Sequence, residues 1–397
     1  MILALRFAMR CIGASRCVRA VSICRRIEGD LALKSPSGTA ENLPLTSIRG
    51  IAALWVAASH YVPSALGTHN RFIDSRFTVI DMFFILSGMT LSTVHARLRW
   101  WGVGRFFLKR CLRIYPMCFV ALTVLLCVIL YPKVNAPWFW NNMNPQLEGS
   151  YLLLGAFIDL HTAGNPPSWS AGIEMACYVA FPVALFALRR LPTWGRVAWL
   201  AASAIFSWCI WANGIASTIG PGALARGVAG FGAGMAIWAI NDEVRMPAAA
   251  IVTAEIAGVA GLILAIDQGW SSYFPMFSAI LLGGLWWDAG PIAGFLRMGW
   301  CVWLGRISFS VYLMHYPLLV AVDKFYPADP GSDWPQIAWF AGIIGAVLAL
   351  SSFTYLTIER PFLRLGRWGR SLDSGEKSAT ATDSRRAAAH PAFRETP

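Results

Sequence analysis

The chain has 397 residues, of which 56% are hydrophobic and only 14% are charged, and its mean hydropathy is +0.53. A soluble globule of this size needs more polar surface, so the composition indicates a multi-pass membrane protein. The formal net charge of +12 does not point to nucleic acid, because the basic residues fall in short loops between apolar runs, as orientation signals do.

Three regions follow one another along the chain. Residues 1–44 form a basic extension with six arginines before the first acid, and they lack an apolar core of signal-peptide length. Two interpretations fit this extension: a helix on the membrane surface, or a start of translation that has been assigned too far upstream. Residues 45–365 form the membrane domain. Residues 366–397 are rich in Ser, Thr, Ala and charge, and we expect them to be a disordered tail.

The membrane domain contains apolar segments that are long enough, or nearly so, to cross a hydrocarbon layer of about 30 Å as helices. The fold class predicted is therefore all-α, with about ten transmembrane helices. The predicted spans lie near 48–66, 77–95, 114–131, 171–188, 197–213, 223–240, 248–266, 271–287, 301–321 and 335–357.

Basic residues cluster in the loops after the second, fourth and tenth spans, whereas the opposite loops carry only Arg71, Arg76, Lys133 and Lys324, which predicts that the basic loops and both termini are cytoplasmic. The corresponding location is the plasma membrane, the inner membrane of a bacterial cell. The apolar segment 150–160 has only eleven residues, and an extra crossing there would invert every later loop. We therefore predict that it is re-entrant or interfacial.

Position along each span converts to depth at about 1.5 Å per residue. Arg49 and His60 are eleven residues apart in the first span, so they lie on one helix face about 16 Å apart along the axis. The same arithmetic puts His315, Asp81 and Glu174 in the outer half with His60. It puts arginines at the cytoplasmic ends of other spans, namely Arg113 and Arg306.

This sorting suits a reaction with an anionic donor inside and a neutral acceptor outside. Arginine binds phosphates bidentately and keeps its charge, whereas a neutral histidine near a carboxylate can remove a proton from a hydroxyl. The competing interpretation assigns the arginines to topology and the histidines to hydrogen bonds between helices.

Six sequence motifs, in order, resemble those of the acyltransferase 3 family of membrane-bound O-acyltransferases, and the resemblance covers residues 44–365. They are the Arg49 to His60 spacing, D-M-F-F-I-L-S-G at 81–88, R-F-F-L-K-R-C-L-R-I-Y-P at 105–116, P-S-W-S-A-G-I-E-M-A-C-Y-V-A-F-P at 167–182, L-G-R-I-S-F-S-V-Y-L-M-H-Y-P at 304–317 and E-R-P at 359–361. The chain departs from the family pattern after Glu174, where Met175 replaces a frequent second acid, and at Cys177, where an aromatic residue is common.

The resemblance implies an enzyme that moves an acyl group, acetyl above all, from cytoplasmic acyl-CoA to a hydroxyl of a glycan or a lipid-linked sugar. It implies no metal and no permanently bound cofactor. The roles that follow are a catalytic base (His60), its carboxylate partners (Asp81 or Glu174), donor phosphate ligands (Arg49, Arg113 and Arg306), and substrate contacts (His315, Trp169 and Ser87). The expected partners are therefore acyl-CoA, the acceptor and the bilayer.

Two other functions compete with this hypothesis. A proton-coupled polytopic transporter would use the buried His, Asp and Glu as relay groups, but it predicts two related halves, and the sequence has no internal repeat. A non-catalytic membrane scaffold would not require Arg49 and His60 on one helix face.

Overall fold

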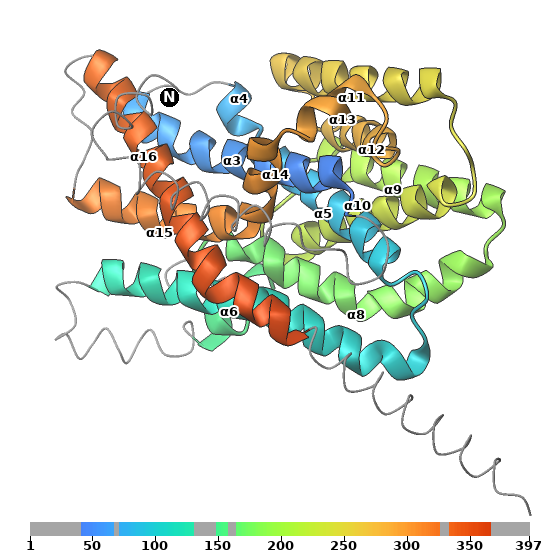
Figure 1. Ribbon diagram of the computed structural model, residues 1–397, viewed down its shortest axis with the longest axis horizontal. Helices are drawn as coiled ribbons and strands as arrows, with labels where there is room; N and C mark the ends of the chain where they lie inside the picture. Colours follow the sequence, from blue (N-terminus) through green and yellow to red (C-terminus); the bar gives the residue numbers. More distant parts are fainter. Residues whose placement is uncertain (1–40, 67–70, 131–147, 158–163, 326–332, 367–397) are drawn as a thin grey trace, which may run out of the picture. The chain divides into compact units, whose positions relative to one another are not determined.

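The computed structural model describes residues 41–66, 71–130, 148–157, 164–325 and 333–366, and in these ranges the chain is helical without strands (Figure 1). The described helices belong to one compact unit that begins at Asn42. The basic extension and the C-terminal tail predicted from the sequence lie almost wholly outside the described residues.

The chain order of the helices follows the predicted spans closely. The longer elements are α3 (Leu43–Leu66), α5 (Arg76–Val94), α6 (Val103–Leu130), α8 (Ser168–Arg190), α9 (Thr193–Ala212), α10 (Gly220–Asn241), α11 (Ala248–Gln268), α12 (Phe274–Leu285), α15 (Ser308–Phe325) and α16 (Asp333–Thr354). The shorter helices are α4 (Arg71–Asp74), α13 (Pro291–Leu296) and α14 (Gly299–Arg306).

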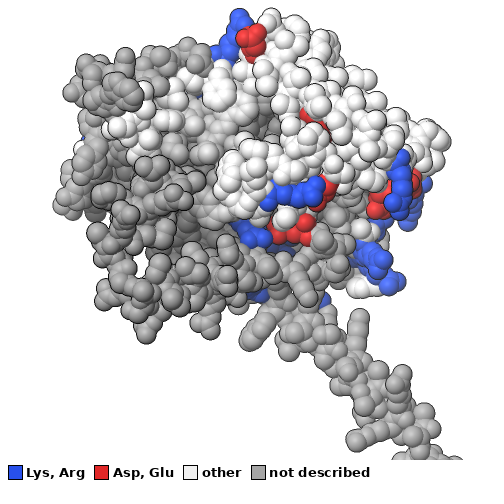
Figure 2. All heavy atoms as spheres, turned by 45° about the horizontal axis from the view of Figure 1, so that its top comes forward, with Lys and Arg blue, Asp and Glu red and all other residues white. Residues whose placement is uncertain are grey.

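Seven of the described helical segments are long and apolar enough to cross a membrane. The prediction of an all-helical membrane protein is therefore confirmed, whereas the count of ten crossings and the cytoplasmic termini stay predictions. On the face shown in Figure 2, charged side chains gather in a few groups, and broad uncharged surface lies between them.

The ninth predicted span, 301–321, is not one helix. It consists of α14 and α15, with Ile307 as the turn between them. The apolar pattern runs through this point without a break, so hydropathy alone could not detect it. Close to this break α14 packs tightly against α3, since a Cβ atom on Gly305 would overlap the carbonyl of Thr46.

The segment 150–160 is no crossing in its described part. It forms a short turn with a 3-10 helix at Leu154–Ala156, and it packs against α8. Leu153 and Ala156 are buried, and a Cβ on Gly172 of α8 would overlap the Leu153 carbonyl. The segment is therefore part of the protein interior, which agrees with the re-entrant alternative.

Helices α5 and α10 make the most extensive helix pair of the fold. Glycines allow this approach: a Cβ on Gly88 would overlap the Phe231 carbonyl, and one on Gly234 would overlap the Ile85 carbonyl. Small residues permit such backbone contact between membrane helices, where van der Waals packing drives association.

Helix α3 packs against α5, α14, α15 and α16. In Figure 1 it lies near the middle of the bundle, and α16 passes obliquely across α15. The C-terminal ends of α5 and α8 meet. The Arg189 guanidinium at the end of α8 donates to the carbonyls of His95 and Leu98, which follow α5, both at 3.0 Å. The N-terminal ends of α5, α8 and α10 accordingly lie together at the opposite side of the bundle.

Candidate active site

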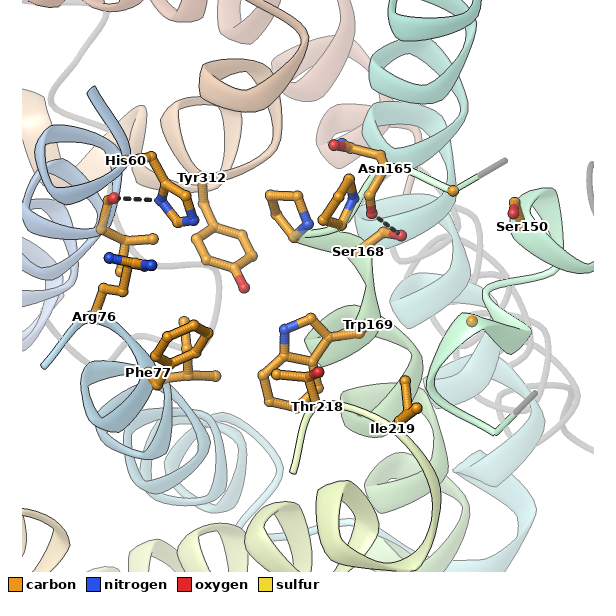
Figure 3. Close-up of a pocket in the computed structure, with 16 residues that line it drawn as sticks. His60, Arg76, Phe77, Ser150, Asn165, Ser168, Trp169, Thr218, Ile219 and Tyr312 are labelled. Atoms are coloured by element: carbon orange, nitrogen blue, oxygen red, sulfur yellow. Dashed lines mark hydrogen bonds between the residues drawn. The ribbon is translucent and has the colours of Figure 1, made fainter. Parts of the chain in front are cut away.

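A pocket with a volume of about 230 Å³ opens where the N-terminal ends of α5, α8 and α10 meet α3 and α15. We call it the histidine pocket. Figure 3 shows His60, Tyr312 and Arg76 on one side of it, with Trp169 across from them. The other described lining residues are Val56, Phe77, Ile80, Ser150, Gly155, Gly164, Asn165, Pro166, Pro167, Ser168, Thr218 and Ile219.

His60 is oriented by its own helix. Its Nδ1 lies 2.7 Å from the carbonyl oxygen of Val56, one turn earlier in α3. Because a carbonyl only accepts, Nδ1 carries the proton in this hydrogen bond, and Nε2 keeps its lone pair. His60 is half-buried and lines the pocket, so the arrangement offers a basic nitrogen to a bound molecule.

His315 stands behind His60 and does not line the pocket. The two imidazole rings are 5.1 Å apart, and the His315 side chain is fully buried. Its Nδ1 lies 3.2 Å from the Val311 carbonyl, while the Tyr61 hydroxyl donates to its backbone carbonyl at 2.5 Å. His315 thus has His60 as its ring neighbour, its buried Nε2 has no hydrogen-bond partner, and its predicted contact with substrate stays a prediction.

Asp81 is not a partner of His60. One carboxylate oxygen accepts from Arg226 Nε at 2.9 Å, and the other accepts from the Trp211 indole at 2.7 Å. Both charged side chains are about 2% exposed. A buried carboxylate needs such a partner to offset its desolvation. The structure thus gives the Asp81 carboxylate an ion pair with Arg226 and no hydrogen bond to His60, and its catalytic role stays a prediction.

This ion pair supports the walls of the pocket. The Arg226 guanidinium also donates to the backbone carbonyls of Ser217, at 2.9 Å, and of Phe77, at 2.5 Å. It lies 5.1 Å from the centre of the Trp169 ring. Phe77 and Trp169 line the pocket directly, and Ser217 precedes the lining residue Thr218.

Glu174 lies on α8 with a different set of partners from those predicted. Its Oε1 accepts hydrogen bonds from the Ser87 and Tyr178 hydroxyls. The Arg110 guanidinium on α6 lies 5.9 Å from the centre of the Tyr178 ring. Arg49 is within electrostatic reach of Glu174, whereas the hydrogen bond that orients His60 goes to a carbonyl.

We call Arg49, Arg110 and Arg113, with the carboxylates Glu174 and Glu359, the arginine cluster. Arg49 interacts electrostatically with Arg113, Glu174 and Glu359, and Arg110 interacts with Arg113 and Glu174. Three arginines and two carboxylates leave a net charge of +1 among these five side chains. The predicted donor ligands Arg49 and Arg113 therefore lie in one region, together with the acid that was assigned to His60.

Glu359 belongs to a π-helical turn, Tyr355–Glu359, that follows α16. Its Oε2 accepts from the Ser310 hydroxyl of α15 at 2.8 Å. Turns of this kind occur often at functional sites. Arg306 ends α14 next to Gly305, and Gly305 approaches the turn of α3 that holds Arg49. The backbone of Arg306 is thus close to that of the cluster.

Ser87 and Trp169 fall in different regions. Ser87 binds Glu174 of the arginine cluster, and Trp169 lines the histidine pocket. Tyr312 also lines the pocket, and its hydroxyl is 2.9 Å from the Ser170 hydroxyl. In the described ranges no three His, Cys, Asp or Glu side chains gather as metal ligands would.

Several site residues were missed by the sequence interpretation, above all Arg226, Arg110 and Asn165. Asn165 is 2% exposed, its Nδ2 donates to the Leu313 carbonyl at 3.0 Å, and its Oδ1 has no partner. The signal for Arg226 was its place inside an apolar span, because ionisable residues there are costly and rarely without a role.

The model of the acyltransferase domain matches residues 44–356. The chain belongs to the acyltransferase 3 family. The match covers the histidine pocket and nearly all of the arginine cluster, so both regions are part of the family domain. Membership favours an enzyme over the transporter and scaffold alternatives.

Two relatives agree with this membership. The chain is 29% identical to acyltransferase MdmB of Streptomyces mycarofaciens over 177 residues, which are 40% of this chain and 42% of that protein. It is 24% identical over 331 residues to BcsY of Komagataeibacter xylinus, whose name describes a membrane-bound transacylase, with 74% and 78% of the two chains covered. The chain thus spans less than half of the first relative. No solved structure matches.

Proposed function

We propose that this acyltransferase uses acyl-CoA, with acetyl-CoA as the principal donor, to acylate a hydroxyl of an extracytoplasmic glycan or lipid-linked sugar. The plasma membrane is the proposed location. The observation that carries the proposal is the position of His60, which lines a pocket and has its Nδ1 committed to the Val56 carbonyl. A base in this setting needs only a hydroxyl within hydrogen-bond distance of Nε2.

The proposed reaction begins when His60 Nε2 takes the proton of the acceptor hydroxyl. The oxygen attacks the thioester carbonyl, and a new C–O bond forms. The C–S bond then breaks, and the CoA thiolate takes the proton back from the imidazolium. The products are an ester and free CoA, and His60 returns to its neutral state. General base catalysis of this kind contributes a factor of about 10²–10⁴.

The arginine cluster is the proposed site of the donor phosphates. Guanidinium groups match phosphate oxygens in geometry and keep their charge in a buried setting. Arg49 and His60 are about 16 Å apart along α3, and the extended arm of a CoA thioester is the natural link between a phosphate site and a distant base. The donor then needs no transport across the membrane.

The test uses the full chain in lipid nanodiscs with radiolabelled acetyl-CoA and an envelope extract from a strain that lacks the gene. His60→Ala should reduce transfer at least 100-fold, and Arg49→Ala should raise the KM for acetyl-CoA. Arg245→Ala is the matched control for a lost guanidinium, because Arg245 is exposed in the loop after α10.

Thermal unfolding and size-exclusion profiles of each variant separate lost chemistry from lost folding. Transfer by a folded His60→Ala variant at the parental rate would refute the catalytic assignment. An unchanged donor KM in Arg49→Ala would refute the proposed phosphate site but not the role of His60.

A further inference from the structure

Arg76 brings a positive charge into the histidine pocket. It starts α5, lines the pocket, and is within electrostatic reach of His60 on α3. Figure 3 shows the two side chains next to each other. Of the described lining residues, Arg76 alone carries a permanent charge. The rest of the lining is apolar or neutral and polar.

The Arg76 side chain is fixed in place but not neutralised. Its Nη1 donates to the Ile73 carbonyl at 3.2 Å, and the guanidinium lies 4.8 Å from the centre of the Phe77 ring. Its Nε is buried and has no hydrogen-bond partner. A carbonyl and an aromatic face orient a guanidinium, but neither of them supplies a negative charge to pair with it.

The carboxylates near Arg76 do not form an ion pair with its guanidinium. Asp81, on the same helix, is committed to Arg226 and Trp211. Asp74 is exposed and within electrostatic reach of Arg76, but it forms no ion pair with it. A partly buried donor without a partner is costly, so the pocket is set up for an anion that arrives with a ligand.

We propose that the histidine pocket selects acceptors that carry a negative charge, a carboxylate or a phosphate, beside the hydroxyl that is acylated, and that Arg76 binds this charge. The proposal rests on the proposed function and adds the chemical class of the acceptor: it replaces the neutral acceptor expected from the sequence with an anionic one, because Arg76 lines the pocket. An anion bound there would offset the Arg76 charge at the place where His60 receives the proton.

The remaining lining fits a polar acceptor with an anionic substituent. The unpartnered Oδ1 of Asn165 can accept from a hydroxyl, and Ser168 and Thr218 add further hydroxyl groups. Trp169 supplies an aromatic wall across from Arg76 and His60. An uronic acid or a sugar phosphate combines the required hydroxyls with a negative charge.

The test measures where the label goes. The parent enzyme transfers radiolabelled acetyl groups to the envelope extract, and anion exchange then separates charged from neutral products. The label should be retained by the anion exchanger. Arg76→Gln should raise the acceptor KM at least tenfold with little change in kcat, and Arg76→Lys should retain most of the affinity. Arg71→Gln is the matched control, because Arg71 is an exposed neighbour outside the pocket.

The possible outcomes test the anionic acceptor separately from the proposed acyltransferase reaction. Label in the unretained fraction, or an unchanged acceptor KM in Arg76→Gln, overturns the anionic acceptor and leaves the acyltransferase reaction standing. A loss in Arg76→Gln that appears with succinyl-CoA but not with acetyl-CoA also overturns it, because the charge then belongs to the acyl group. No label above the His60→Ala background in any fraction refutes the proposed function itself.

Discussion

The histidine pocket and the arginine cluster lie at two levels of the same bundle, and α3 contributes to both through His60 and Arg49. In the pocket, His60 bonds to a carbonyl, so its second nitrogen is left for a ligand. In the cluster, Glu174 already accepts from Ser87 and Tyr178. The first region presents a basic nitrogen to a pocket. In the second region both carboxylates accept hydrogen bonds from hydroxyl groups, and the arginines exceed the carboxylates by one charge.

This difference fits the different tasks that we propose for the two regions. Proton removal needs a lone pair that no neighbour occupies, whereas phosphate binding needs fixed cations whose repulsion is controlled by interspersed carboxylates. A buried ion pair is stable only if its geometry satisfies both partners. Asp81 and Arg226 meet this condition in a place apart from the arginine cluster. The buried charges of Asp81 and Arg226 are therefore structural, and the histidine pocket, whose described lining has Arg76 as its one permanently charged side chain, is the proposed place for the chemistry.

The largest effect should come from a comparison of two single substitutions, one at His60 and one at His315. His60→Gln removes the pocket base, and we expect turnover to fall by about 10²–10⁴. His315→Gln should cost less than tenfold, because the His315 ring is fully buried behind His60. Steady-state acetyl transfer at saturating donor and acceptor checks the pair. A larger loss in His315→Gln would move the base to the inner imidazole.

Breaking the ion pair should act on stability. Arg226→Met leaves the Asp81 carboxylate buried without its cation, and we expect a loss of about 3–5 kcal/mol in the free energy of unfolding. The double variant Asp81→Asn with Arg226→Met should recover part of that loss, because no buried charge remains. Denaturant unfolding in detergent measures both. An Arg226→Met variant as stable as the parent would show that the pair is not structural.

The sequence predicted the arrangement along α3 well, because a helical period fixes direction and rise. It placed His60 toward the outer half, and the structure puts this residue in a pocket formed by the N-terminal ends of α5, α8 and α10. It also placed Arg49 and Arg113 together, and the structure shows them within electrostatic reach. Both results depend on the axial position of a residue within a span.

Lateral partners were not predictable from the sequence. Depth does not say which neighbouring helix a side chain faces, so the sequence offered Asp81 or Glu174 as the partner of His60. The partner of Asp81 is Arg226, which is 145 residues away in a span whose glycines let α10 approach α5. The break at Ile307 was missed because the apolar pattern runs through this position without interruption.

A smaller effect should show whether Glu174 acts as a member of the arginine cluster or as a catalytic group. Glu174→Gln keeps an oxygen that can accept from Ser87 and Tyr178, so only the negative charge is lost. Removing an anion from the arginine cluster favours a bound phosphate, and we expect the KM for acetyl-CoA to fall by about 2–5-fold, while turnover stays within about tenfold of the parent. A loss of turnover by two orders of magnitude or more would instead return Glu174 to the catalytic machinery.

The smallest effect concerns a charged pair outside both regions. Glu243 follows α10 in an exposed loop and forms an ion pair with Arg196 at the start of α9, where the Thr193 hydroxyl also donates to it at 3.0 Å. The hydrogen bond from Arg196, followed by that from Thr193, lowers the pKa of Glu243 below its ordinary value of 4.5. A lowered carboxylate pKa stabilises the folded state above the unfolded pKa, and this contribution is lost as the pH falls through the folded pKa.

We therefore expect Glu243→Gln to lower the Tm slightly at pH 7, and we expect the difference from the parent to vanish at pH values well below 4.5. Exposed pairs contribute little and are screened by salt, so the difference should also shrink in 1 M NaCl. Acetyl transfer should not change, because the pair touches neither the histidine pocket nor the arginine cluster. A difference in Tm that persists at low pH would show that the glutamate acts through packing, because the charge that Arg196 binds is then absent.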